Sequence, residues 1–443
     1  MNSERREALD EMIVKMRAGR MTRRTFIERS AILGLSATFV GTLLDACGSG
    51  GSASGPTVIS WESENEATGT YSAIVNTFNQ SQKNVQVHWT NGPSDSGQLL
   101  TKFSTMLRAR SNSIDIMSMD IIWPAQFGAS GWTYPIDSKW PASERTKYLP
   151  GPIQGCTYQG KIWAAPFRTD AGLIYYRTDL VPTPPSTWEE LTSMAQQAVS
   201  GGGVKYGYVW QGAQYEGVVC DFVEVVYGYG GSILDPTDPT KVTTTSPQTV
   251  QGLTTMVNWV GGVSPQAVTT YKEEDARTTF QNGDAAFMRN WPYAYAHGQN
   301  ASESKIVGKF DVHTMLYGGS NTTGHSALGG WQLGINAFSK NTDAAWQFVS
   351  YMMQPAAQKT AALQASLTVT LQSIYDDAEV LAKNPFFAKL KPVFQTAQPR
   401  PVTPKYPDVT LAIQQSVHDA LLKSSSPTDA MNSLASKLQG IVA

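Results

Sequence analysis

The stretch TVISW, residues 57–61, has the β-branched and aromatic composition of a strand, and it opens the pattern that decides the fold. Apolar side chains follow at Tyr71, Ile74, Val75 and Phe78, which is the spacing of one helix face. A second strand, a second helix and a third strand are expected next, over NVQVHW (84–89), around Leu99, Phe103, Met106 and Leu107, and over IDIMSMD (114–120). This β-α-β-α-β alternation predicts an α/β fold with a parallel sheet covered by helices.

Acidic residues lie at the ends of two of these predicted strands. Glu62, Glu64 and Glu66 follow the first strand, and Asp120 ends the third. Ligands of such sheets bind just beyond the carboxyl ends of the strands. We therefore expect these carboxylates to converge on one edge of the sheet.

The composition is that of an ordinary globular chain. The 443 residues are 41% hydrophobic and 16% charged, so the chain can bury a large core and is too long for one domain. Two lobes are therefore expected. The formal net charge of -2 comes from 34 basic and 36 acidic side chains without a basic cluster, which argues against a partnership with nucleic acid.

The N-terminal segment has the features of an export signal. Two arginines lie in TRRTFIE (22–28), and an apolar run of about 14 residues follows over 31–44, short of the ~20 that span a bilayer. TRRTFIE resembles a twin-arginine signal, and LDAC, ending at Cys47, resembles a lipobox. We expect residues 1–46 to be a signal peptide, Cys47 to be lipidated and 47–55 to include a flexible tether. The alternative is a plain secretory signal, cut elsewhere, with Cys47 discarded.

Two further cysteines, Cys156 and Cys220, have no metal-binding or redox spacing. Buried free thiols are the simpler interpretation, and a disulfide between them is left open. No motif in the sequence predicts a metal or a cofactor.

Two tryptophans are predicted to fill helix cores. Ser186 and Glu189 have the spacing of a capping box, which predicts the start of a helix that buries Trp188. Trp346 lies on the apolar stripe of a later predicted helix.

Two other tryptophans do not fit a helical stripe. Trp291 precedes a proline in RNWPYAY (289–295), and Trp331 follows Gly329 and Gly330, which are expected in a turn. Rings on loops and turns tend to face clefts, so these are candidates for the wall of a binding site.

Several long strings resemble, in sequence order, the trehalose/maltose-binding proteins of ABC sugar importers (extracellular solute-binding protein family 1). They are DIIWPAQFGASGWTYPID, AGLIYYRTDL followed by PPSTWEEL, VWQGAQYEGVVCDFVEVVYGYGGS, FQNGDAAFMRNWPYAYA, LGGWQLGIN and PRPVTPKYP. The resemblance runs from about Val58 to the C-terminus. It implies a two-lobed periplasmic-binding-protein-like fold of type II, with the ligand cleft between the lobes.

The resemblance also implies where the chain crosses between the lobes. The crossings are expected at about 168–173, 308–312 and 336–340. One lobe would then combine 56–168 with 311–337, and the other 173–306 with 340–443.

The family resemblance assigns the site residue by residue. A sugar presents an apolar C–H face, which packs on an aromatic ring, and a rim of hydroxyls, which need carboxylate acceptors and guanidinium donors. The residues implied to bind the sugar are Glu66, Asp120, Asp170, Trp291, Tyr293, Gly329, Gly330, Trp331 and Arg400.

Two positions depart from the better-known relatives. This chain has Leu99 and Leu100 where they carry an Arg near the sugar, and Arg168 where they carry a Tyr. Arg168 is therefore a further candidate ligand contact, and charged or substituted saccharides are left open.

The resemblance implies a monomeric, non-enzymatic protein that captures a disaccharide such as trehalose or maltose by hinge closure. Its partners would be the permease and ATPase of an ABC importer, with the membrane touched only through the lipid anchor. It would lie outside the cytoplasmic membrane or in the periplasm. The alternative is a hydrolase that uses paired carboxylates, although we find no GxSxG, HExxH or phosphate-binding glycine loop.

Overall fold

The computed structural model describes residue 25 and residues 55–66, 68–93, 95–235 and 238–443. The predicted lipidation site Cys47 and, apart from Thr25, the predicted signal peptide lie outside the described residues. The described residues divide into two compact units, one with residues 55–58 and 79–86 and the other with the described residues of 59–78 and 87–443. In the described part of the first unit, Thr57 N donates to Asn84 O over 2.8 Å.

The predicted β-α-β-α-β pattern is confirmed. It consists of β1 (Thr57–Ser63), α4 (Thr70–Ser81), β2 (Val85–Asn91), α5 (Ser96–Arg108) and β3 (Ile116–Asp120). The predicted face of α4 is buried throughout, and β1 and β3 are parallel.

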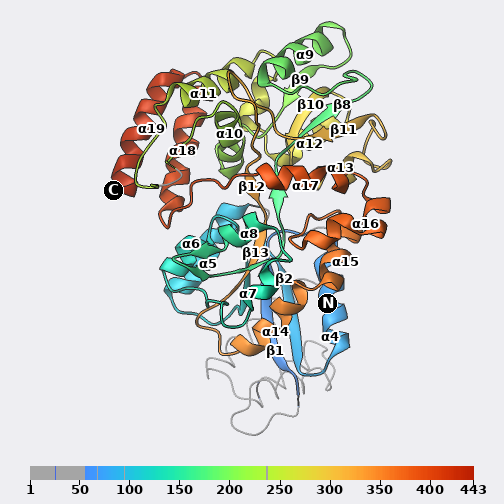
Figure 1. Ribbon diagram of the computed structural model, residues 1–443, viewed down its shortest axis with the longest axis vertical. Helices are drawn as coiled ribbons and strands as arrows, with labels where there is room; N and C mark the ends of the chain where they lie inside the picture. The colour runs from blue at the N-terminus through green and yellow to red at the C-terminus, as the bar shows by residue number, and fades with distance from the viewer. Residues whose placement is uncertain (1–24, 26–54, 67, 94, 236–237) are drawn as a thin grey trace. The chain divides into compact units, whose positions relative to one another are not determined.

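These strands belong to a mixed five-stranded sheet. Its order is β2-β1-β3-β13-β6, where β13 (Trp331–Ile335) runs antiparallel to both β3 and β6 (Ala165–Pro166). In Figure 1 the orange helix α14 (Thr342–Met352) lies near the blue strand β1, and the rings of Phe348 and Trp61 are 5.5 Å apart. A late segment of the chain thus covers the earliest strand.

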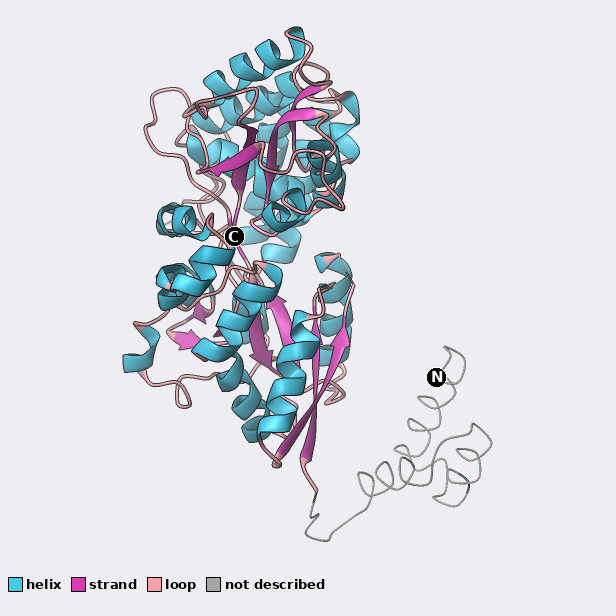
Figure 2. Cartoon of the chain, turned by 90° about the vertical axis from the view of Figure 1, so that its right-hand side faces the viewer, coloured by secondary structure: helices cyan, strands magenta, loops and turns pink. Residues whose placement is uncertain are grey.

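A second sheet has four strands. Its order is β11-β8-β10-β9, formed by Phe310–His313, Leu173–Arg177, Ala285–Asn290 and Tyr206–Val209. Strand β8 is antiparallel to β10 and β11, and β9 is parallel to β10. Figure 2 shows helices flanking the strands of both sheets.

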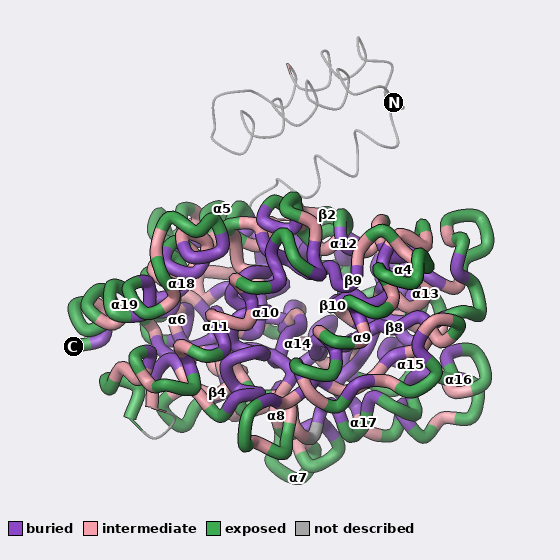
Figure 3. Tube along the Cα trace, turned by 90° about the horizontal axis from the view of Figure 1, so that it is seen from above, coloured by how far each residue is buried: buried purple, intermediate pink, exposed green. Residues whose placement is uncertain are grey.

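The second sheet shares one large apolar core with its helices. Helices α9 (Trp188–Ser200), α10 (Glu216–Gly228), α11 (Pro247–Trp259), α18 (Tyr406–Leu421) and α19 (Pro427–Val442) all contribute to it. Figure 3 shows buried backbone along α10, in which every residue from Gly217 to Gly228 is buried. The predicted burial of Trp188 is confirmed, because it is 1% exposed.

The remaining described helices and strands have at most 11 residues. They are α6 (Pro124–Ala129), α7 (Ala142–Arg145), α8 (Pro150–Gly155), α12 (Glu273–Gln281), α13 (Ala294–Gly298), α15 (Pro355–Ala365), α16 (Ala378–Lys383), α17 (Phe387–Thr396), β4 (Thr157–Tyr158), β5 (Lys161–Ile162), β7 (Asp170–Ala171) and β12 (Leu328–Gly329), with 3-10 turns at Gln266–Thr270 and Gln372–Asp376.

Three local predictions need correction. The capping box of α9 is formed by Thr187 and Glu190, one residue later than expected, because Thr187 has the extended backbone of an N-cap. Trp331 opens strand β13 instead of lying in a turn, since β13 pairs along its whole length with β3. Trp346 is only half-buried, because α14 buries its Ala345, Phe348, Val349 and Met352 side instead.

The expected positions of two crossings between the lobes disagree with the way the strands and helices pack. Strand β11 pairs with β8, so residues 311–313 belong with the four-stranded sheet and not with the first lobe. Helix α14 buries its apolar face near β13 and Trp61, so the chain stays with the five-stranded sheet beyond residue 340.

Cys156 and Cys220 are both buried and free, which confirms the simpler interpretation of these two described thiols. No helix within the described part of the chain combines the length and the apolar composition needed to cross a membrane.

Candidate functional site

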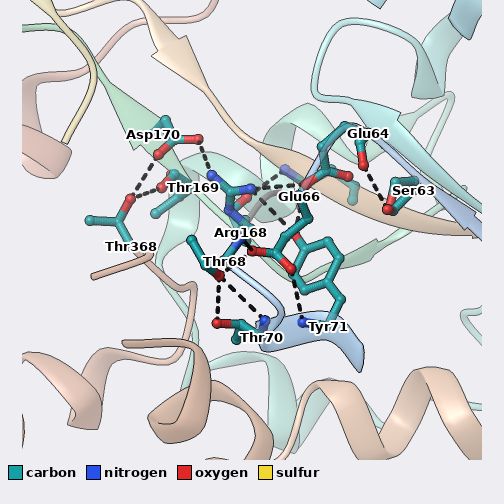
Figure 4. Close-up of polar contacts among 12 residues, drawn as sticks. Ser63, Glu64, Glu66, Thr68, Thr70, Tyr71, Arg168, Thr169, Asp170 and Thr368 are labelled. Atoms are coloured by element: carbon teal, nitrogen blue, oxygen red, sulfur yellow. Dashed lines mark hydrogen bonds and ion pairs between the residues drawn. The ribbon is translucent and has the colours of Figure 1, made fainter. Parts of the chain in front are cut away.

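Arg168 occupies the centre of a buried polar network, shown in Figure 4. It lies in the short segment between β6 and β7 and is 8% exposed. Its Nη1 donates to Glu64 Oε1 over 2.9 Å and to the Tyr71 hydroxyl over 3.2 Å, and its Nη2 donates to Asp170 Oδ2 over 3.3 Å. Asp170 also accepts a 2.9 Å bond from Thr368 Oγ1. The guanidinium therefore joins two carboxylates that are distant in sequence.

Burial dominates the electrostatics of this network. It raises the pKa of Glu64 and of Asp170, and the charge of Arg168 opposes both shifts. Burial alone would lower the pKa of Arg168, but Tyr71 and the two carboxylates raise it above its ordinary value. Arg168 is thus a permanent cation that is neutralised from two sides.

A second guanidinium, Arg400, has the same arrangement. Its Nη1 donates to Glu216 Oε1 over 2.7 Å, and its Nη2 donates to Asp120 Oδ1 over 3.0 Å. Asp120 ends β3, whereas Glu216 begins α10 and also accepts bonds from Tyr406 and Thr410. Burial raises the pKa of Asp120, with Arg400 opposing the shift. Arg400 therefore links the five-stranded sheet to the helices packed around the four-stranded sheet.

Two half-buried tryptophans flank the networks. Trp331 pairs in register with Asp120, and its ring meets that of Trp123 edge-on at 5.7 Å. Trp291 follows β10, and the guanidinium carbon of Arg289 lies 3.9 Å from the centre of its ring. Its Nε1 donates to Glu273 Oε1 over 3.4 Å. One face of Trp291 is therefore held by a buried cation.

Tyr293 is held by an acidic neighbour rather than by the two networks. Its hydroxyl donates to Glu274 Oε1 over 2.5 Å.

Gly329 and Gly330 bring the two networks close to the aromatic residues. Gly329 pairs with Asp170, and a Cβ at this position would lie 3.0 Å from Trp291 Cζ3. Gly330 has a φ of +117°, and a Cβ there would lie 2.3 Å from the carbonyl oxygen of Arg168. A side chain at either position would push the strand away from the site.

We expect Gly330→Ala to lower the free energy of unfolding by about 2 to 4 kcal/mol, because the new methyl group meets a backbone atom and the backbone conformation is one that only glycine adopts readily. Gly308→Ala is the matched control: its φ is +71° and nothing lies within 4 Å of the added Cβ, so about 1 kcal/mol is expected. Urea unfolding measures both, and equal losses would contradict the close approach.

Glu66 lies beside the Arg168 network and caps a helix (Figure 4). Its carboxylate accepts from the backbone N–H of Thr68 over 2.7 Å and of Tyr71 over 3.2 Å, at the start of α4. It therefore satisfies the free amides of a helix N-terminus. It shares no direct polar contact with Arg168 among those found in the described chain.

The sequence did not single out several members of the networks. Glu64 is one of three acids expected after the first strand, the helical spacing of Tyr71 predicts only a place in the core, and no pattern indicates Glu216 or Thr368. Among the described residues, no three His, Cys, Asp or Glu side chains are placed to hold a metal ion.

The arrangement can bind a polar, uncharged molecule, because it can both donate hydrogen bonds to that molecule and accept hydrogen bonds from it. It combines carboxylate acceptors and guanidinium donors with the faces of two indole rings.

Comparison with known proteins gives a consistent picture. Residues 61–359 match the model of the family described as bacterial extracellular solute-binding protein. The chain is 40% identical over 362 residues to a probable ABC transporter-binding protein of Deinococcus radiodurans, covering 79% of this chain and 85% of that one. It is 24% identical over 310 residues to the maltotriose-binding protein of Pyrococcus abyssi, covering 69% and 65%.

Solved structures agree. The maltose-bound T. maritima MalE3 is 35% identical with a TM-score of 0.81, covering 87% of this chain and 99% of that one. A Thermotoga lettingae solute-binding protein with bound α-D-tagatose has a TM-score of 0.78 at 22% identity, with 87% and 100% covered, which shows likeness of fold.

Proposed function

Since the chain belongs to the bacterial extracellular solute-binding protein family, with the two-lobed α/β fold of its structural neighbours, we propose that it captures a disaccharide such as maltose or trehalose and delivers it to an ABC importer. The permease and the ATPase of that importer are its proposed partners, and the protein acts as a monomer without catalysis. The two relatives and the Thermotoga lettingae neighbour are themselves described as binding proteins, and the T. maritima neighbour is described as maltose-bound.

One observation carries the proposal. The strand segment that contains Gly329, Gly330 and Trp331 pairs with Asp170 on one side and with Asp120 on the other. It thereby brings both guanidinium–carboxylate networks together with Trp291 and Trp331. Hydroxyl-binding groups beside aromatic faces are what a saccharide requires.

The proposed ligand contacts are Asp120, Asp170, Trp291, Gly329, Gly330, Trp331 and Arg400, with Arg168 and Tyr293 bordering them. Glu66 is proposed only as support for the helix that carries Tyr71, because its carboxylate is occupied by backbone amides.

Titration calorimetry with maltose, trehalose, maltotriose and a set of neutral monosaccharides tests this function. We expect a disaccharide to bind with a dissociation constant of micromolar order or tighter, and no product to accumulate on long incubation. Sugar cleavage would favour the hydrolase alternative, and failure of every saccharide to bind would overturn the proposal.

We further propose that Cys47 is lipidated and holds the mature protein on the outer face of the cytoplasmic membrane. Cys47→Ser should move the protein from the membrane fraction to the soluble fraction of cells, because a single residue carries the anchor. Cys156→Ser, at a buried thiol, is the control and should leave the distribution unchanged. A Cys47→Ser protein that stays with the membrane would contradict lipidation at this position.

A further inference from the structure

We infer that the site selects its ligand by charge: it accepts a neutral or amine-bearing saccharide and rejects one that carries a carboxylate or phosphate. This inference rests on the proposed function and concerns the groups that surround the two guanidinium ions. It assigns a selective role to Glu64, Asp170 and Glu216 through their effect on the charge of the site.

Each guanidinium in the site is already matched by two carboxylates. Arg168 lies 2.9 Å from Glu64 and 3.3 Å from Asp170. Arg400 lies 2.7 Å from Glu216 and 3.0 Å from Asp120. With all four acids ionised, the two networks together carry two more negative charges than positive ones.

Two neighbouring cations also form ion pairs with carboxylates. Arg289 contacts Asp221 at 2.8 Å and Glu224 at 2.6 Å, and Lys102 forms an ion pair with Glu62. An anionic ligand would therefore have to displace a carboxylate from its guanidinium, which leaves that carboxylate buried without a counter-ion.

The unsatisfied atoms of the networks point to the same class of ligand. Among the described residues, Glu64 Oε2 is buried without a hydrogen-bond partner, and so are Arg168 Nε and Arg400 Nε. A hydroxyl can donate to the first and accept from the others. A carboxylate or phosphate dianion only accepts, so it would leave Glu64 Oε2 unsatisfied and repelled, whereas a protonated amine would donate to it.

The test uses three disaccharides that differ at one position. The parent is whichever of maltose and trehalose binds more tightly, and the other two replace one CH₂OH by an aminomethyl group or by a carboxylate. Calorimetry in low salt should give the amine analogue a dissociation constant within about tenfold of that of the parent, in either direction. The carboxylate analogue should have a dissociation constant at least a hundredfold larger than that of the parent. A carboxylate that binds within threefold of the parent would overturn the inference.

Two variants locate the effect. Asp170→Asn and Glu64→Gln each remove one charge beside Arg168 with little change in shape. Each should therefore lower the ratio of the dissociation constants of the carboxylate analogue and the parent by about tenfold. Two variants are used in case one folds poorly, which circular dichroism detects. The control is Glu62→Gln, because Glu62 lies only two residues before Glu64 in the chain but pairs with Lys102 instead of Arg168. An equal change in the control would assign the selectivity to net charge and overturn the role of the Arg168 network.

The two proposals fail in different ways. If neither maltose nor trehalose binds but a carboxylate analogue of one of them does, the charge selection is overturned while saccharide capture survives. If no saccharide binds, the proposed function falls and this inference falls with it.

Discussion

Replacing Arg289 by methionine should lower the free energy of unfolding by about 3 to 5 kcal/mol near neutral pH, a large part of the stability of an ordinary fold. Arg289 is 1% exposed. It donates to both oxygens of Glu224, over 2.7 and 2.6 Å, and to Gln211 Oε1 over 3.1 Å. Its Nε also lies 2.8 Å from Asp221 Oδ1, an ion pair whose geometry falls short of a hydrogen bond. Methionine would leave two buried carboxylates without a counter-ion.

The loss should depend on pH in a defined direction. Burial raises the pKa of Asp221 well above its ordinary value, and the charge of Arg289 opposes that shift. Without Arg289 the pKa of Asp221 rises further. A group with a raised pKa in the folded state binds more protons when folded, so its contribution to stability falls as pH rises. The deficit of the variant should therefore be smaller at pH 5 than at pH 8.

Two comparisons separate lost charge from lost packing. Adding Glu224→Gln to Arg289→Met should restore part of the stability, because one unpaired carboxylate is removed. Lys147→Met is the exposed control: its pair with Glu144 lies on the surface, so a change within about 0.5 kcal/mol is expected. Denaturant unfolding at both pH values measures all of these. A double variant less stable than Arg289→Met would assign the loss to packing.

The buried cluster of Arg289, Asp221 and Glu224 is indicated only weakly by the sequence. Asp221 and Glu224 are three residues apart in VVCDFVEVV, an otherwise apolar run. Acids at that spacing share one helix face, and an apolar helix cannot bury them without a cation. The sequence could therefore indicate that a partner exists. It could not identify Arg289, which is 65 residues from Glu224 along the chain.

The first sheet was predictable because its signal is local. Strand and helix periods in residues 57–120 specify each element and its buried face, and α4 buries the residues expected of it. The fate of the three acids after β1 was not predictable, because the strand ends at Ser63 and the chain then turns. Glu62 pairs with Lys102, Glu64 pairs with Arg168, and Glu66 caps α4. Period-two spacing holds only while the strand continues.

The site depends on contacts that no local pattern encodes. Arg400 and Glu216 are 184 residues apart, and Arg168 and Glu64 are 104 apart. Composition and spacing identify the residue types of such a site, and the resemblance to a family selected most of the positions. Which carboxylate meets which guanidinium is decided by how loops, strands and helix α10 pack together, a tertiary property.

Trp291→Ala should weaken binding of the best disaccharide by about thirtyfold or more, on the order of 2 kcal/mol, while the protein remains folded. The ring is half-buried, with one face on Arg289 and an edge near Gly329. We propose that its other face stacks on the sugar. Trp346→Ala removes another half-buried indole, on α14, which holds no proposed contact. It should leave the affinity unchanged, and calorimetry below the melting temperature of each variant compares the two.

The same substitution tests the hinge mechanism. Asp120 and Trp331 lie on the five-stranded sheet, whereas Trp291 follows a strand of the four-stranded sheet. A sugar that touches both groups stabilises the state in which they lie together, and only this difference in affinity can shift the equilibrium toward closure. Small-angle scattering should therefore show a smaller radius of gyration for the wild type with saturating sugar. At that same sugar concentration the radius of gyration of the Trp291→Ala variant should decrease less, because a smaller fraction of its molecules holds sugar. Tight binding with no change of radius in the wild type would contradict closure around the ligand.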